Sequence, residues 1–328
     1  MSESKAYKII FAGSPDFALP TLAALEKSAH EVIAVITQED KPVGRRQIMT
    51  ETPVKQFAKA RGIKVYDPQS LKLGPETAEL AAEDCDFLIT AAYGKLMPRW
   101  ILDLPRIKAL NVHASLLPKY RGAAPVQAAV LNGDEEAGVS IMEMVEELDA
   151  GPVYWQERIK LEAEESGGSL FSKLAELGAK ALLNCLTKWP ELQPEAQDES
   201  QVTFTKKLDR AAGKIDWSKT ALEIERLIRA YYPWPSAHCF LEGERFIVWQ
   251  AELIAKSKQE ALSYYAQELG RELSPSELLP GTVIVAGKQM TVICGAGALN
   301  LIEVQKAGQK RILAQELAHN LPLGTVLV

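Results

Sequence analysis

The 328-residue sequence has few of the residues that metal, disulfide and imidazole chemistry need. Its four cysteines are widely spaced and form no Cys-x-x-Cys pair, which argues against a zinc site or a disulfide framework. Each cysteine is expected to be a small buried residue. With only four histidines, candidates for imidazole chemistry are few. We expect no bound metal ion.

Long apolar runs are also missing, so no segment of about 18 residues predicts a membrane-spanning helix. The N-terminal residues lack the basic start and apolar stretch of a signal peptide, and we expect a cytoplasmic chain without a membrane partner. The net charge of −6 is unusual for a nucleic-acid-binding protein. Residues 211–328 are neutral overall, however, so charge neither supports nor excludes an RNA partner.

A dinucleotide-binding fingerprint is absent as well. The turn after the first expected strand reads Gly13-Ser14-Pro15-Asp16 instead of Gly-x-Gly-x-x-Gly. Pro15 has no backbone N–H to donate to a phosphate, so NAD binding is disfavoured.

The first half of the chain does contain short apolar runs that alternate with amphipathic stretches. This pattern is typical of a doubly wound, Rossmann-like α/β fold with a mostly parallel sheet. The expected strands are 8–13, 31–37, 64–66, 87–92, 109–113 and 139–144, and the expected helices are 16–27, 53–61, 77–83 and 169–186.

The second half has a different organisation. We predict a catalytic domain at 1–190, a polar, proline-containing linker at 191–212 and a smaller OB-like β-barrel domain at 213–328. Thr220 and Glu223 have the capping-box spacing of a helix start. Glycine-bounded strands are expected at 245–254, 281–286, 289–294, 298–305 and 324–328, with 256–280 as a surface insertion.

Polar residues at the end of the strand 109–113 are the best candidates for chemistry. Period-2 alternation puts Asn111 and His113 on one face at the carboxyl end, where open α/β sheets bind ligands. Asp149 lies in a turn beside Gly151, soon after another strand. Together, an amide, an imidazole and a carboxylate suit acyl transfer. The amide donates to a carbonyl oxygen, the imidazolium stabilises an oxyanion, and the carboxylate keeps the imidazolium charged and helps to accept the amine proton.

The residues alone leave other interpretations open. His113 is compatible with a structural role at a strand end, and Asp149 with a turn. A metal site at these two residues lacks a third ligand at suitable spacing. Ser115 is a weak candidate nucleophile because no Gly-x-Ser-x-Gly elbow surrounds it, and the loop with Lys119 and Arg121 is expected to form a rigid polar rim.

A resemblance to a known family adds to this interpretation. The run Asn-Val-His-Ala-Ser-Leu-Leu-Pro-x-x-Arg-Gly at 111–122, followed by Leu-Asp-Ala-Gly at 148–151, resembles the signature of the 10-formyltetrahydrofolate-dependent formyltransferases. Further segments resemble the methionyl-tRNA formyltransferases of that family, and the likeness covers nearly the whole chain apart from insertions. These segments are 10–18, 92–94, 215–217 and 228–235.

The resemblance implies transfer of the formyl group of 10-formyltetrahydrofolate to the amino group of methionyl initiator tRNA for translation initiation. It implies direct attack by the amine, with no covalent enzyme intermediate and no metal ion. Asn111, His113 and Asp149 are the implied catalytic residues. The implied folate-binding residues, several of them acting through their backbone, are Leu88, Ala91, Ala92, Tyr93, Ser115, Leu116, Leu117, Pro118, Val145, Glu147 and Leu148.

The resemblance also implies that the loop 41–49 enters the acceptor stem of the tRNA through Arg45 and Arg46. Gln47 and Ile48 stand where lysines are common in the family, which is a departure from its pattern. Trp217, Trp234 and Trp249 could form a base-stacking platform, but Trp217 and Trp234 flank the C-terminal helix in an apolar context and are expected in a core.

Three other functions remain compatible with the sequence. The first is a formyltransferase with another acceptor, such as an amino sugar nucleotide or a purine ribotide. The second is a formylfolate hydrolase, in which water replaces the amine. The third is a non-catalytic tRNA-binding protein, which would not require Asn111, His113 and Asp149 together. We expect a monomer.

Overall fold

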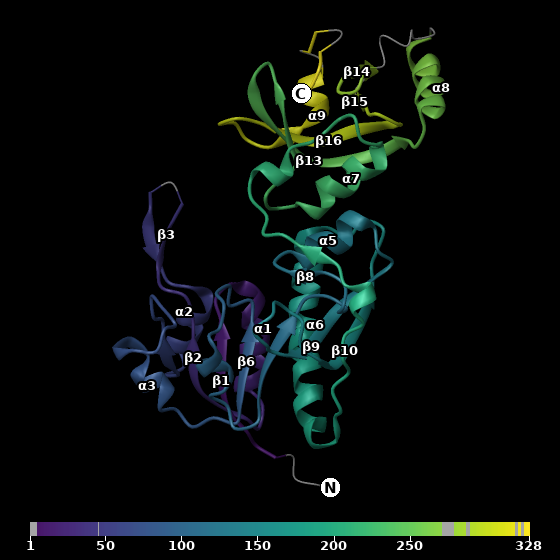
Figure 1. Ribbon diagram of the computed structural model, residues 1–328. Helices are drawn as coiled ribbons and strands as arrows, with labels where there is room; N and C mark the ends of the chain where they lie inside the picture. The colour runs from purple at the N-terminus through teal and green to yellow at the C-terminus, as the bar shows by residue number, and fades with distance from the viewer. Residues whose placement is uncertain (1–4, 45, 271–278, 287–288, 319–320, 323–324) are drawn as a thin grey trace. The chain divides into compact units, whose positions relative to one another are not determined.

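The computed structural model describes residues 5–44, 46–270, 279–286, 289–318, 321–322 and 325–328 (Figure 1). The chain divides into two units. The first comprises residues 1–125, 136–160 and 171–206, and the second comprises 126–135, 161–170 and 207–328. Residues 191–206, within the segment expected to be a linker, therefore belong to the first unit.

The apolar runs of the first half form one sheet with the order β10-β9-β7-β6-β1-β2-β5. Its parallel strands are β1 (Lys8–Gly13), β2 (Glu31–Ile36), β5 (Lys64–Tyr66), β6 (Phe87–Ala91) and β7 (Lys108–His113). The antiparallel strands are β9 (Glu136–Glu143) and β10 (Val153–Lys160). Because the chain winds from central β1 to one edge and then returns to β6 on the other side, the predicted doubly wound class is confirmed.

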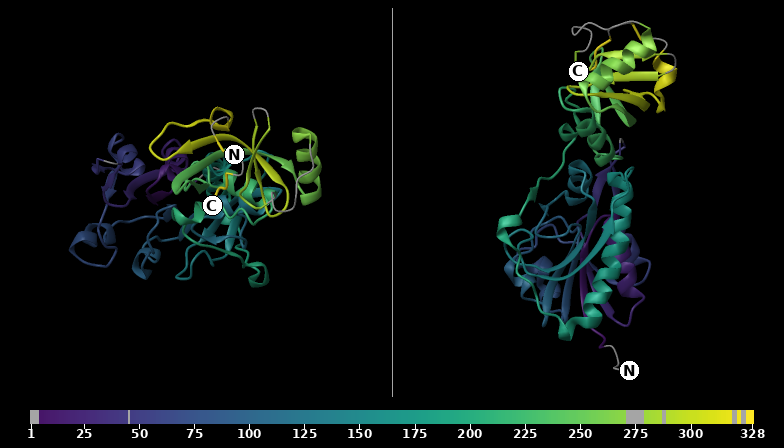
Figure 2. Two further views of the ribbon diagram at one scale, coloured as in Figure 1. Left: turned by 90° about the horizontal axis from the view of Figure 1, so that it is seen from above. Right: turned by 90° about the vertical axis from the view of Figure 1, so that its right-hand side faces the viewer.

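Buried side chains cover both faces of this sheet. On one face Ile10, Leu88 and Ala109 lie side by side in register and share a core cluster. On the opposite face α6 (Gly167–Lys188) runs along the strands (Figure 2), and it approaches so closely that a Cβ on Gly178 would lie 2.7 Å from Val112. Asn111 and His113 alternate with Val112, so they lie on the face away from α6.

The remaining elements of the first half are short. The helices are η1 (Asp16–Ala18), α1 (Leu19–Glu26), α2 (Pro53–Lys59), η2 (Pro75–Thr77), α3 (Ala78–Ala81), α4 (Arg99–Leu102) and α5 (Pro125–Asn132). The short strands are β3 (Lys41–Val43) and β4 (Ile48–Thr50), which form a hairpin, and β8 (Arg121–Gly122) and β11 (Phe204–Thr205), which pair in parallel. The short helices η3 (Trp189–Glu191), η4 (Glu199–Gln201) and η5 (Ala211–Gly213) follow α6.

The second unit is an antiparallel sheet with the order β12-β13-β16-β15-β14, to which β17 adds beside β16. Its strands are β12 (His238–Leu241), β13 (Glu244–Ala255), β14 (Val283–Ala286), β15 (Gln289–Ile293), β16 (Ala298–Lys306) and β17 (Ile312–Leu313). Its helices are α7 (Ala221–Ala230), α8 (Lys258–Leu269), which lies in the expected insertion, and α9 (Ala314–Ala318).

The ends of this sheet are joined by the last residues of the sequence. Val328 exchanges two backbone hydrogen bonds with Phe240 in β12, and Leu327 donates to Gly281 just before β14. The sheet therefore curls toward the small barrel that the sequence predicts.

Two detailed predictions for the second unit have different outcomes. The capping box is confirmed: Thr220 Oγ1 accepts from Glu223 N at 3.2 Å, and Thr220 N donates to Glu223 Oε2 at 2.9 Å. Trp217 is 4% exposed, as predicted. The prediction for Trp234 is wrong: it is 51% exposed, in the turn that follows α7, between two prolines.

Candidate active site

The candidate site begins at the carboxyl end of β7. Asn111 pairs with Thr90 of β6 on one side and Met142 of β9 on the other, and His113 pairs with Ser140. His113 is buried and Asn111 is half-buried. The structure therefore brings both predicted side chains to one face, at the edge where parallel strands bind ligands.

The ring of His113 is oriented by two oxygen atoms. Its Nε2 lies 3.0 Å from the backbone oxygen of Tyr120, and a carbonyl oxygen can only accept, so Nε2 carries a proton. Its Nδ1 lies 3.7 Å from Asp149 Oδ2, an ion-pair distance that is longer than a direct hydrogen bond. Nδ1 is therefore the ring atom that a carboxylate and a substrate can share.

Asp149 is held from the side opposite His113. Its Oδ2 accepts a hydrogen bond of 2.8 Å from the backbone N–H of Gly122. Its backbone has φ = 51°, a left-handed conformation that non-glycine residues adopt rarely and that is often found at functional sites. One carboxylate oxygen thus contacts both a backbone donor and the imidazole.

The loop after β7 is fixed by Ser140 and Gln156 from the two antiparallel strands. Ser140 Oγ donates to Ser115 O at 2.7 Å and accepts from Leu117 N at 3.0 Å. Gln156 Nε2 donates to Leu117 O at 2.8 Å. Ser115 Oγ itself donates to Lys119 O at 2.6 Å, so its hydroxyl serves to shape the loop.

The other residues expected to bind folate lie in three segments: β6 with the residues after it, the loop after β7, and the turn before Asp149. At the end of β6, Leu88 and Ala91 are fully buried, whereas Ala92 is exposed with φ = 48°. In the turn before Asp149, Val145 is 38% exposed and Leu148 is 55% exposed. The remaining positions are Leu116 and Pro118, which are half-buried, Leu117 and Tyr93, which are buried, and Glu147, which is exposed.

Two buried polar atoms near β6 lack a partner. Within the part of the chain that the structure describes, Thr90 Oγ1, in register with Asn111, and the Tyr93 hydroxyl have no hydrogen-bond partner. Burial raises the pKa of Tyr93 to about 12, so its hydroxyl stays protonated and able to donate. Buried polar groups without a partner are uncommon in folded proteins and are often found where a ligand binds.

Sequence reasoning missed a group of residues that support the Asp149 turn. Gln197 Nε2 donates to the backbone oxygens of Asp149 and Gly151, and its Oε1 accepts from Arg121 Nε at 2.9 Å. Arg121, from the loop expected to form a rigid polar rim, is only 4% exposed and is paired with Glu199 at 2.7 Å. The side chain of Arg121 is thus held by two residues of the segment that follows α6, Gln197 and Glu199. A glutamine in a polar stretch gave no sequence signal of this role.

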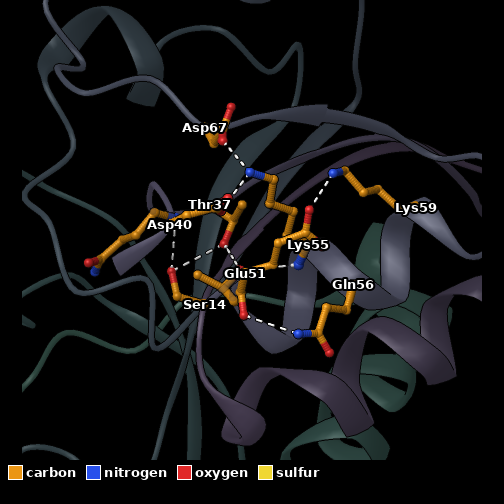
Figure 3. Close-up of polar contacts among 10 residues, drawn as sticks. Ser14, Thr37, Asp40, Glu51, Lys55, Gln56, Lys59 and Asp67 are labelled. Atoms are coloured by element: carbon orange, nitrogen blue, oxygen red, sulfur yellow. Dashed lines mark hydrogen bonds and ion pairs between the residues drawn. The ribbon is translucent and has the colours of Figure 1, made fainter. Parts of the chain in front are cut away.

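A second polar network follows β1 and β2 (Figure 3). Thr37 Oγ1 lies 2.6 Å from Thr52 Oγ1 at the start of α2, and Ser14 Oγ accepts a hydrogen bond of 3.2 Å from the backbone N–H of Gln38. Nearby, Lys55 Nζ bridges two carboxylates. Asp40 lies at 2.6 Å from it and Asp67 at 2.7 Å. These contacts anchor both ends of the β3–β4 hairpin.

That hairpin contains the residues expected to contact tRNA and projects from the first unit (Figure 1). Arg46 is exposed, and Arg45 lies outside the described residues. Val43 and Ile48 face each other across the hairpin, and they are 56% and 60% exposed. Among the described residues, no three His, Cys, Asp or Glu side chains are grouped to hold a metal ion, and no helix is long and apolar enough to cross a membrane.

Comparison with known sequences identifies similar proteins. Residues 7–186 match the family model described as formyl transferase, and residues 207–322 match its C-terminal domain. A curated protein of Lachnospira eligens, named methionyl-tRNA formyltransferase, is 41% identical over 308 residues, which are 93% of this chain and 94% of the relative.

Comparison with solved structures identifies similar folds. HypX from Aquifex aeolicus in complex with tetrahydrofolic acid matches with a TM-score of 0.59 at 15% identity, over 95% of this chain and 47% of HypX. The chain thus spans about half the length of HypX. An N-formyltransferase from Helicobacter canadensis in complex with folinic acid and dTDP-3-aminofucose matches with a TM-score of 0.60 at 17% identity, over 89% of this chain and 98% of that one. At such identities the likeness shows the fold alone.

Proposed function

This chain belongs to the methionyl-tRNA formyltransferases, and from that premise we propose that it transfers the formyl group of 10-formyltetrahydrofolate to the free amino group of methionyl initiator tRNA. The observation that carries the proposal is the approach of His113 Nδ1 to Asp149 Oδ2 at 3.7 Å, beside Asn111 on the same strand. The catalytic work is assigned to residues 1–190 and part of the tRNA binding to 213–328, joined by 191–212.

The folate would supply an activated formyl group, and three side chains of the protein would act on it. The Asn111 amide donates to the formyl oxygen and orients the carbonyl. The His113 imidazolium, oriented through Nε2 by the Tyr120 carbonyl, stabilises the negative charge that develops on that oxygen. The Asp149 carboxylate pairs with His113 and accepts the proton that the attacking amine loses, directly or through water. The bond between the formyl carbon and the folate nitrogen then breaks, and that nitrogen takes up a proton as tetrahydrofolate leaves.

The residues around this trio fit a folate. The exposed apolar side chains of Val145 and Leu148 suit an aromatic ring, and backbone groups from 88 to 93 and from 145 to 149 suit its polar edge. The unpartnered Thr90 hydroxyl lies one strand from Asn111 and offers a further donor at the reacting end. The chemistry assigned to the trio requires no metal ion.

Recognition of the tRNA is assigned to the β3–β4 hairpin and the second unit. Arg46, exposed on the hairpin, and Arg45 are the proposed contacts to the acceptor stem. Gln47 and the exposed Ile48 follow, where the family often has lysines, so this hairpin would contribute fewer phosphate contacts than a fully basic one.

The first test is formylation itself. The protein is incubated with 10-formyltetrahydrofolate and either initiator or elongator Met-tRNA, and formyl-methionine is measured. We expect formylation of the initiator alone. We expect His113→Ala to lower kcat by about 10²–10⁴-fold. His30→Ala is the matched control, because His30 precedes β2 at the opposite, amino edge of the sheet.

Two results would contradict the proposal. Release of formate without formyl-methionine would indicate a hydrolase. Formylation of an amino sugar nucleotide but of neither tRNA would indicate another acceptor.

A further inference from the structure

We propose that Gln197 is a positioning residue of the catalytic centre, which holds the Asp149–Gly151 turn so that the Asp149 carboxylate stays between Gly122 and His113. This inference rests on the proposed function, because it concerns the residue to which the amine proton is assigned.

The contacts of Gln197 converge on the turn. Its side-chain amide donates one hydrogen bond of 2.8 Å to Asp149 O and a second of 2.7 Å to Gly151 O. These carbonyl groups lie two residues apart, on either side of Ala150. One planar amide therefore restrains both ends of the turn and fixes the direction in which Asp149 projects.

The orientation of the Gln197 amide is determined by Arg121. Arg121 Nε donates to Gln197 Oε1 at 2.9 Å, so the oxygen of the amide faces the cation and the nitrogen faces the two carbonyls. A flipped amide would place N–H against N–H and oxygen against two oxygens, which excludes that arrangement. Arg121 is in turn held by both oxygens of Glu199.

The Asp149 turn needs such a restraint. With φ = 51°, Asp149 adopts a backbone conformation that costs about 1–3 kcal/mol for a non-glycine residue and persists only where its surroundings enforce it. Its carboxylate has one backbone donor, Gly122 N, and reaches His113 only at ion-pair distance. A small shift of the turn would therefore separate the carboxylate from the imidazole.

The exposure pattern singles out Gln197 in its segment. Residues 193–201 are exposed except for Gln197, which is half-buried. Its neighbour Gln201 makes only a local contact, through Nε2 to Asp198 Oδ2 at 2.7 Å. Gln201 is therefore a matched control of the same residue type in the same segment.

Two substitutions separate positioning from packing. Gln197→Met keeps the volume and removes all three hydrogen bonds. Gln197→Glu keeps the shape and the contact to Arg121, but its carboxylate cannot donate to the Asp149 and Gly151 carbonyls and repels them. We expect both variants to lower kcat by about 10- to 100-fold, because displacing a catalytic group by about 1 Å has effects of this size.

The KM values of both substrates should stay within about threefold of the wild type, because no substrate contact is assigned to Gln197. Gln201→Met should behave as the wild type. Thermal melts of each variant show whether it is folded. Gln197→Glu keeps an acceptor for Arg121 Nε and adds a negative charge beside that cation, which offsets the two lost hydrogen bonds, so it is expected to melt near the wild type.

The outcomes are distinct. Wild-type kcat in Gln197→Glu would overturn the inference, since it would show that filling space and pairing Arg121 are enough. A rise in KM with unchanged kcat would also overturn it, by assigning Gln197 to binding. If the wild type itself forms no formyl-methionine, the proposed function fails. If the wild type forms formyl-methionine, His113→Ala does not form it, and both Gln197 variants have the wild-type kcat, then the proposed function stands and this inference alone fails.

Discussion

Gly151→Ala would add one methyl group at the point where the Asp149 turn passes closest to β9. A Cβ on Gly151 would lie 1.9 Å from the backbone oxygen of Glu143 and 2.9 Å from its carbonyl carbon. Carbon and oxygen atoms approach to about 3.3 Å without repulsion, so the two segments must separate by roughly 1.4 Å. Glu143 is held in β9 by its register with Leu110 in β7, so the turn is the part that moves.

The expected consequence is a large loss of activity with a moderate loss of stability. A displacement of about 1 Å at a catalytic group can lower the rate about 100-fold, so we expect kcat to fall by about that factor. Overpacking of this kind typically costs about 1–3 kcal/mol of unfolding free energy. Because Gly151 O also accepts from Gln197, the same displacement weakens the support of the turn.

The assay is initiator Met-tRNA formylation, with urea unfolding on the same samples. Gly74→Ala is the control: its backbone is extended, and an added Cβ would meet no atom closer than 4.0 Å. We expect this control to keep its activity and to change stability by less than about 0.5 kcal/mol. If Gly151→Ala were folded and had a kcat within about twofold of the wild type, the assignment of Asp149 to the reaction would be refuted.

Two further predictions concern stability, and both are measured by urea unfolding. Lys55→Met should cost about 1–3 kcal/mol, since Asp40 and Asp67 lose their shared cation. Burial lowers the pKa of Lys55, but hydrogen bonds to the Asp40 and Asp67 carboxylates outweigh burial and raise the pKa above 10.5. The stabilisation is therefore complete below pH 10.5 and is lost as the pH rises further. The difference in unfolding free energy between Lys55→Met and the wild type should shrink in strong alkali. Trp217→Ala should cost about 3–5 kcal/mol, because the side chain is 4% exposed, whereas Trp234→Ala, at 51% exposed, should cost less than about 1 kcal/mol; equal losses would contradict the burial assigned to them.

The elements with a buried side were predictable from sequence, and those without one were not. β1, β6 and β7 were located to within one residue because each is an apolar run bounded by polar or glycine residues. β10 was missed because its residues are mostly half-exposed and include charges, as an edge strand allows. The β3–β4 hairpin was missed because all its described residues are exposed, so no apolar period marks it.

The same limit applies to the candidate site. Asn111 and His113 share a face because side chains alternate along a strand with a period of two residues, so this placement could be predicted once the strand was located. The oxygen that orients His113 belongs to the backbone of Tyr120, and backbone groups carry no residue-specific signal. Gln197 also contacts backbone carbonyl groups, those of Asp149 and Gly151, which lie 48 and 46 positions earlier in the chain. Contacts of this kind depend on where two segments meet, which composition and periodicity do not describe.

Glycines in the motif nevertheless carry part of this information. Gly122 donates to the Asp149 carboxylate, has φ = 109°, and would place a Cβ 2.2 Å from Thr205 O. Only glycine combines that conformation with that approach. Gly122 therefore marks the place where β11 lies against the loop that follows β7, just as Gly151 marks the approach of the turn to β9. The two glycines lie on either side of Asp149, and each records a close backbone contact that positions its carboxylate.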